Sequence, residues 1–151
     1  MKMEYRFNKK FVEFGGDYQL EREEECKLPI SLLGQSIVLF DNCYFYESLV
    51  NDIAYSDYFI DATGNECFFN KIHIEDYLDE RDSDKLLDYG ISYAKHLSKK
   101  LAQLNEGEFN VILSYDEETC TIRFHKCREG EEYLAQDLET YLLDAVLVIT
   151  N

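Results

Sequence analysis

The stretch that decides the fold is residues 82–125, DSDKLLDYGISYAKHLSKKLAQLNEGEFNVILSYDEETCTIRFH. Its first half places apolar residues on one stripe at 3.6-residue spacing, which is typical of an amphipathic helix over about 83–105. Asp82-Ser83-Asp84 provides a helix start, and the Asn105–Gly107 stretch provides its end. The second half alternates apolar and polar residues on either side of 116–119, which predicts two strands joined by a turn.

Elements that follow one another through short connections are usually neighbours in space. We therefore expect the helix stripe to pack on one face of the two strands, with Arg123 and His125 on the opposite face. Gly90 lies within the stripe, where a missing side chain would let a strand approach the helix closely. The predicted core contains Leu87, Ile91, Ala94, Leu97, Leu101, Phe109, Val111, Leu113, Ile122 and Phe124.

The segments before the long helix are rich in aromatic residues. Tyr5 to Phe14, followed by Gly15-Gly16, predicts a strand or hairpin arm, and 36–40 predicts a strand. Residues 41–55 favour a helix, although their aromatic content leaves a strand open. Two β-rich runs at 58–61 and 66–72 flank a Gly-Asn pair, which predicts a hairpin.

At the C-terminal end, residues 131–141 have a helical spacing of apolar residues that predicts a short helix. The run Ala145–Ile149 is apolar at every position, which indicates a strand that is covered on both faces. Together these segments predict an α+β fold, in which a mostly antiparallel β-sheet carries the long helix and shorter helices. The length of 151 residues fits a single domain over 1–151.

The charge balance restricts the classes of partner. Lysine and arginine total 15 residues and aspartate and glutamate total 31, so the net charge is −16. Binding to nucleic acid or to an anionic membrane relies on basic side chains, so we expect neither. A partner protein with a basic surface is the natural complement of this charge.

No segment has the length and apolarity of a membrane span or of a signal peptide, and we therefore expect a cytoplasmic protein. Five cysteines are present without a C-x-x-C pair, which favours reduced thiols and argues against a zinc site or a redox site. The sequence also lacks a phosphate-binding loop, a dinucleotide fingerprint and a nucleophile elbow. We expect no cofactor, no metal and no enzymatic activity.

A candidate binding surface lies between Lys27 and Lys71, an interval that contains no lysine or arginine. Carboxylates steer a basic partner, and tyrosines provide contact area at low entropic cost. The opposing interpretation is that the tyrosines are core residues and the acids serve solubility. The candidate partner-binding residues are Tyr44, Tyr46, Glu47, Asp52, Tyr55, Asp57, Tyr58 and Asp61.

The C-terminal third carries a resemblance to a known group. The run Cys120–Glu131, then 133–139 and finally 145–149, resembles the closing part of small bacterial immunity proteins that accompany polymorphic toxins, including toxins of contact-dependent growth inhibition. The pattern is a strand, an R-E-G-E turn at 128–131, a short helix and a last strand. The first 80 residues resemble that group only loosely.

The resemblance implies a cytoplasmic inhibitor without catalysis, which binds a cognate toxin domain and blocks its active site or an adjacent exosite. Such toxins are commonly nucleases with basic surfaces, which fits the acidic charge. The alternative is an acidic regulatory or adaptor module, or a mimic of nucleic acid, that binds another basic protein. The sequence leaves the oligomeric state open.

Overall fold

The computed structural model describes residues 2–53 and 61–151. Within them the chain forms an α+β fold. The α-helices are α1 (Lys9–Glu13), α2 (Gly16–Glu21), α3 (Ile30–Leu33), α4 (Val50–Ile53), α5 (Ala62–Phe69) and α6 (Leu86–Ala102). The strands are β1 (Glu4–Phe7), β2 (Ile37–Phe40), β3 (Cys43–Tyr46), β4 (Ile72–His73), β5 (Phe109–Tyr115), β6 (Cys120–Lys126) and β7 (Ala145–Thr150). Short 3₁₀ helices cover Glu47–Leu49, Ile74–Tyr77, Glu80–Lys85 and Leu138–Thr140.

The main sheet has five strands in the order β1-β7-β5-β6-β4, and β2 and β3 form a separate two-stranded sheet. All of these strand pairs are antiparallel. The hairpin of β5 and β6 places Val111 opposite Phe124 and Leu113 opposite Ile122. The predicted strands 109–115 and 120–125 are therefore confirmed, and the apolar side chains Val111, Leu113, Ile122 and Phe124 lie in one layer.

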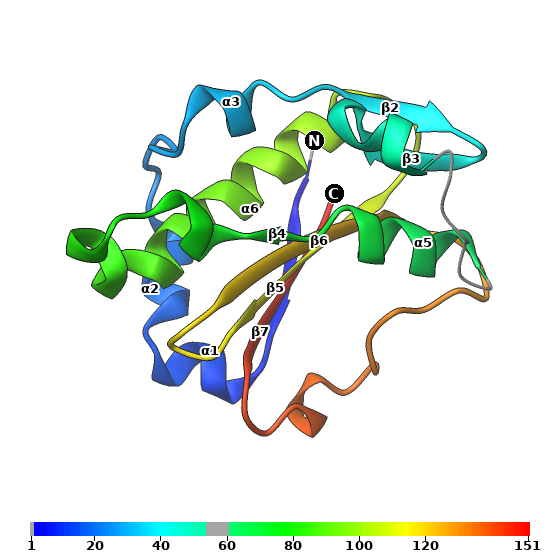
Figure 1. Ribbon diagram of the computed structural model, residues 1–151. Helices are drawn as coiled ribbons and strands as arrows, with labels where there is room; N and C mark the ends of the chain where they lie inside the picture. The colour runs from blue at the N-terminus through cyan, green and yellow to red at the C-terminus, as the bar shows by residue number, and fades with distance from the viewer. Residues whose placement is uncertain (1, 54–60) are drawn as a thin grey trace.

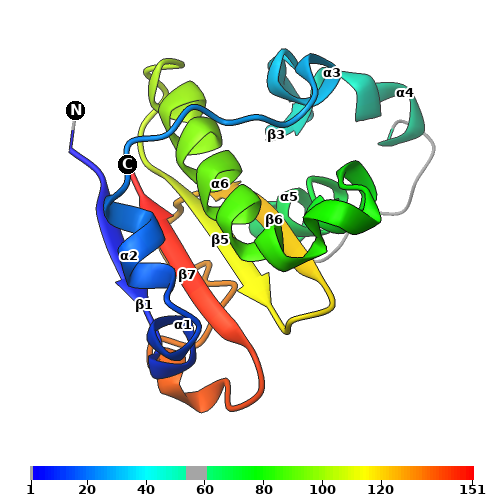
Figure 2. The same cartoon turned by 90° about the vertical axis from the view of Figure 1, so that its left-hand side faces the viewer.

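Helix α6 lies along one face of the main sheet, with α1 and α2 beside it on the same face (Figures 1 and 2). The 3₁₀ turn Glu80–Lys85 leads into α6, so the predicted helix over 83–105 is confirmed with slightly shorter bounds. Every residue of the predicted core is buried, and all of them belong to one cluster. Gly90 contacts β5 and β6, because a Cβ atom placed there would meet Leu113 and Cys120.

The opposite face of the sheet is covered by the segment between β6 and β7. Ile112, Val146 and Val148 pack there against Leu138, which explains why β7 is buried on both faces as predicted. The predicted helix over 131–141 is wrong: the segment is mostly irregular and contains the three-residue turn Leu138–Thr140.

The irregular segment is held in place by Asn8 rather than by helical hydrogen bonds. Asn8 is 1% exposed, and its Nδ2 donates to the carbonyl oxygens of Leu138, Tyr141 and Asp144. Its Oδ1 accepts hydrogen bonds from the amides of Phe11 and Val146. The same side chain caps α1, so the predicted N-terminal strand stops at Phe7 and Phe11 belongs to a helix.

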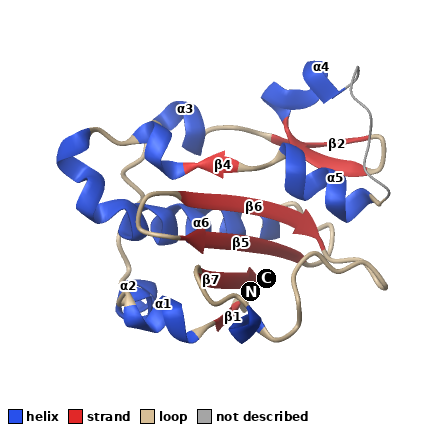
Figure 3. Cartoon of the chain, turned by 60° about the horizontal axis from the view of Figure 1, so that its bottom comes forward, coloured by secondary structure: helices blue, strands red, loops and turns tan. Residues whose placement is uncertain are grey.

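Two predictions before the long helix need correction. Residues 58–60 of the predicted hairpin lie outside the described residues. Its turn and second run are wrong, because residues 62–69 form α5, and Asp61 caps this helix by accepting a hydrogen bond from the Gly64 amide. The helix favoured for 41–55 is wrong at 43–46, which form strand β3, and right at α4, while residues 54 and 55 lie outside the described residues. The predicted strand 36–40 is confirmed as β2. In Figure 3, β2, β3 and α5 lie together beyond β6.

No helix in the two described ranges is both long enough and apolar enough to cross a membrane.

Candidate functional site

The two tyrosines of the candidate surface that the structure describes are core residues. Tyr44 is 6% exposed and Tyr46 is 3% exposed, and their rings pack edge-on against Phe109 and Phe124. The hydroxyl of Tyr46 forms a 2.7 Å hydrogen bond with the hydroxyl of Tyr93 on α6. The expectation that Tyr44 and Tyr46 offer contact area to a partner is therefore wrong, because β3 lies between the main core and a second apolar cluster.

The carboxylates of the candidate surface have a different position. Glu47, Asp52 and Asp61 are exposed, at the ends of β3, α4 and the start of α5. Tyr55, Asp57 and Tyr58 lie outside the described residues. Among the described residues of this candidate surface, the acids thus lie outside and Tyr44 and Tyr46 lie inside.

Glu66 explains why β3 and α5 lie together. It is fully buried, and its two carboxylate oxygens accept hydrogen bonds from the backbone amides of Tyr44 (2.7 Å) and Lys126 (2.9 Å). The guanidinium of Arg128 pairs with both oxygens at 2.7 and 2.8 Å. One turn later, Asn70 accepts from the Tyr46 amide and donates to the Tyr44 carbonyl. The side chains of Glu66 and Asn70 thus hydrogen-bond the backbone groups of β3 that face away from β2. Both carboxylate oxygens of the buried Glu66–Arg128 ion pair are hydrogen-bonded.

The R-E-G-E turn over 128–131 has a structural role. Arg128 binds Glu66, and Glu131 accepts a hydrogen bond from the Thr63 amide at the start of α5. Gly130 has a φ of +78°, a backbone conformation that favours glycine. The turn therefore fastens α5 to the end of β6, which explains its residues without any contact to a partner.

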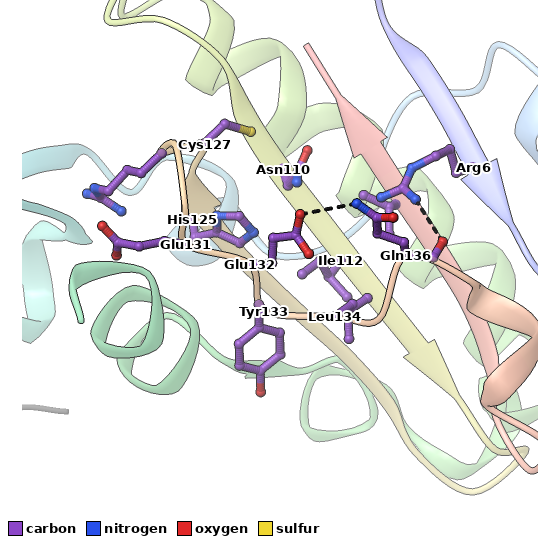
Figure 4. A pocket seen from close by; sticks show the side chains of 12 residues that line it. Arg6, Asn110, Ile112, His125, Cys127, Glu131, Glu132, Tyr133, Leu134 and Gln136 are labelled. Carbon is purple, nitrogen blue, oxygen red and sulfur yellow. Dashed lines mark hydrogen bonds between the residues drawn. The ribbon is translucent and has the colours of Figure 1, made fainter. Parts of the chain in front are cut away.

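A polar cavity lies on the second face of the sheet, under the segment that follows β6. Its volume is about 390 Å³. Figure 4 shows His125 and Asn110 along its floor strands, with Glu132 and Gln136 hydrogen-bonded across its rim. His125 lies on this face as predicted, but the covering segment leaves the ring only 4% exposed. The remaining lining residues are Arg6, Ile112, Cys127, Arg128, Glu131, Tyr133, Leu134 and Val148.

His125 on β6 and Cys127, directly after that strand, line the same cavity, and their spacing of two residues was the signal available in the sequence. Nδ1 of His125 donates to the Lys126 carbonyl, which leaves Nε2 as an acceptor in the neutral ring. Burial lowers the pKa of His125, and burial together with nearby Glu108 raises the pKa of the Cys127 thiol to about 11. A raised pKa favours the thiol over the thiolate, which is the stronger nucleophile.

No group of three histidine, cysteine or acidic side chains in the described ranges is arranged to hold a metal ion.

Several cations of the chain are used to hold the fold together. Lys95 on α6 donates to the carbonyls of Leu20 and Arg22, and Lys100 donates to those of Leu33 and Gln35. These lysines tie the long N-terminal connection to the helix. Arg128 is paired with Glu66, and Arg123 stacks on the Tyr133 ring.

Carboxylates are concentrated on the surface instead. A concave surface of about 370 Å³ lies between the β5–β6 turn and the 3₁₀ segments before α6. Leu78 and Leu86 contribute its apolar part. Its acidic residues are Glu75, Asp79, Glu80, Glu117 and Glu118.

The comparisons with known proteins add one assignment. Residues 7–151 match a family described as the Uncharacterized protein PM0498 family, and the chain belongs to this family. The comparison with curated proteins and the comparison with solved structures gave no match.

Proposed function

We propose that the protein is an immunity protein, which binds a cognate bacterial toxin domain with a basic surface, such as a nuclease, and neutralises it without catalysis. The observation that carries this proposal is the separation of charge. The sequence has 31 acidic and 15 basic residues, and Lys95, Lys100 and Arg128 are engaged within the fold. Glu47, Asp52 and Asp61 are exposed, and acids also line the concave surface beside the β5–β6 turn.

The geometry also favours binding over chemistry. In the cavity that combines a histidine with a cysteine, burial raises the pKa of the Cys127 thiol, and Nδ1 of His125 donates to a backbone carbonyl. A negative surface accelerates the encounter with a basic domain and discriminates against acidic proteins. The resemblance of the C-terminal third to immunity proteins supports the same conclusion.

The test is co-expression with the toxin domain encoded beside this protein. The expected result is rescue of growth, together with a complex whose association rate falls steeply as salt rises, since charges are screened over about 8–10 Å at physiological ionic strength. The charge-reversal variants Glu47→Lys and Asp52→Lys should weaken rescue, while Glu129→Lys, in the 128–131 turn, serves as a matched control. Failure of the wild-type protein to rescue growth would refute the proposal.

A basic protein other than the toxin, captured with the same salt dependence but without rescue, would favour the alternative of an acidic adaptor module.

A further inference from the structure

Strand β1 leaves one edge of the main sheet open. It stands first in the strand order and pairs with β7 alone. All four residues of Glu4–Phe7 are exposed, and the strand runs along the border of the sheet in Figure 2. An edge of this kind presents unpaired backbone groups and is a template for another strand.

The register shows which backbone groups face outward. The amide of Asn8 donates to the carbonyl of Val146, and Arg6 lies opposite Val148. Alternate residues of an antiparallel strand direct their N–H and C=O groups to the same side. The backbone groups of Glu4 and Arg6 therefore face β7, and those of Tyr5 and Phe7 face away from the sheet.

We propose that this edge pairs with β1 of a second copy, antiparallel and with Tyr5 opposite Tyr5 of the second copy. The outward backbone groups of both tyrosines then form a hydrogen-bonded pair on the two-fold axis. Met3 lies opposite Phe7 of the second copy, so apolar side chains meet on the face that carries α1 and α2. The two sheets become one continuous sheet across the axis.

Charge complementarity selects this register. Glu4 lies opposite Arg6 of the second copy, and Arg6 opposite its Glu4, in non-hydrogen-bonded positions where side chains come closest. The two neighbouring registers that keep the faces matched place Glu4 against Glu4 or Arg6 against Arg6. Among the described residues Glu4 has no salt-bridge partner, and Arg6 makes one long hydrogen bond of 3.5 Å to the Gln136 carbonyl. Both side chains are thus available for the pairing.

The short strand and the net charge determine how strong the association is. A four-residue edge belongs to the small, weak class of interfaces. Each copy carries a net charge of −16, so the two copies repel each other at long range. Rising salt should therefore strengthen self-association, whereas it weakens binding to a basic toxin domain. Self-association and toxin binding thus respond to salt in opposite directions, so an experiment can distinguish failure of this proposal from failure of the proposed function.

The first test is sedimentation equilibrium of the full chain, up to roughly millimolar concentration and at several salt concentrations. Glu4→Arg and Arg6→Glu should each weaken the dimer, on the order of tenfold or more, because each creates two like-charge pairs. The double variant Glu4→Arg/Arg6→Glu should restore it. A wild-type monomer throughout this range, or a double variant as weak as the single ones, would overturn the proposal.

The second test reads the register by oxidation. Tyr5→Cys should form a disulfide-linked dimer, since hydrogen-bonded positions lie about 5.5 Å apart between Cα atoms, within the range of a disulfide. Glu4→Cys should not, because its counterpart lies two positions further along the second strand. The wild-type protein with its five cysteines is the control. Equal cross-linking of the two variants would contradict the register.

Discussion

Gly90 provides the sharpest test of how α6 packs on the sheet. A Cβ atom at this position would lie 3.3 Å from Cδ1 of Leu113 and 3.7 Å from Cβ of Cys120, and far inside the contact distance of the Cys120 sulfur. Both neighbours are buried strand residues with no exposed surface. The substitution Gly90→Ala therefore overpacks the core, and the sulfur of Cys120 is the main obstacle.

The magnitude follows from two opposing terms. Overpacking a core typically costs about 1–3 kcal/mol, and replacing glycine by alanine within a helix gains about 1 kcal/mol. The expected net loss for Gly90→Ala is up to about 2 kcal/mol of the free energy of unfolding. The two terms partly cancel in the net value for Gly90→Ala. The coupling free energy between Gly90→Ala and a substitution at Cys120 is therefore the quantity that isolates the contact.

The assay is a double-mutant cycle by urea unfolding. Cys120→Ala leaves a small cavity in the wild-type background, but in the Gly90→Ala background it also removes the obstacle. The double variant should therefore be more stable than the sum of the single changes predicts, by about 1–3 kcal/mol. Cys67→Ala, a buried cysteine on α5, is the matched control and should be additive with Gly90→Ala. Additivity within about 0.5 kcal/mol for Cys120 would refute the described contact.

Three further predictions concern buried polar groups. Asn8→Asp places a carboxylate against three carbonyl oxygens, so its folded-state pKa should be raised, and urea unfolding should show a penalty that grows as pH rises above about 4. Burial lowers the pKa of His125, so its contribution to stability is present above the unfolded value of about 6.5 and is lost as pH falls; His125→Gln should flatten the stability difference between pH 7 and 5. Glu66→Gln leaves the guanidinium of Arg128 uncompensated and should cost about 3–5 kcal/mol by thermal or urea unfolding, whereas Glu129→Gln on the exposed turn should change stability by less than about 0.5 kcal/mol.

The part of the fold that could be predicted is the part whose signals are local. The stripe of α6 and the alternation of β5 and β6 each show in consecutive residues, and a short connection joins them. Their packing therefore followed from sequence neighbourhood alone. The position of Gly90 against the strands was predicted for the same reason, because a glycine inside the apolar stripe of a helix usually marks a close packing contact.

The segments that were wrongly predicted depend on contacts between distant residues. The run Cys67-Phe68-Phe69 favours a strand by composition, yet it belongs to α5 because Glu66 and Asn70, four residues apart, satisfy the backbone of β3. The Asp61 cap was the local signal that could have indicated a helix start. The segment after residue 131 is positioned by Asn8, more than 120 residues earlier, and no local pattern could reveal this.

For a related reason, the sequence could not distinguish the buried tyrosines of the candidate surface, Tyr44 and Tyr46, from its exposed acids. Alternation of tyrosine with acids in 44–61 fits a contact surface and a strand beside a core equally well. Burial of Tyr46 beside Tyr93 decides for the core, because both hydroxyls find their hydrogen bond inside the protein. The acids of the same interval that the structure describes lie on the surface, where water solvates their charge.

The charge balance of the chain bears on both proposals. Lys95 and Lys100 each donate to two backbone carbonyls of the N-terminal connection, so part of the small cationic complement holds the fold together. The negative field that should attract a basic toxin comes from the net charge of −16. The same field opposes pairing of two β1 edges at low salt. A titration with salt on one sample should consequently move the protein in opposite directions, out of the toxin complex and into the dimer.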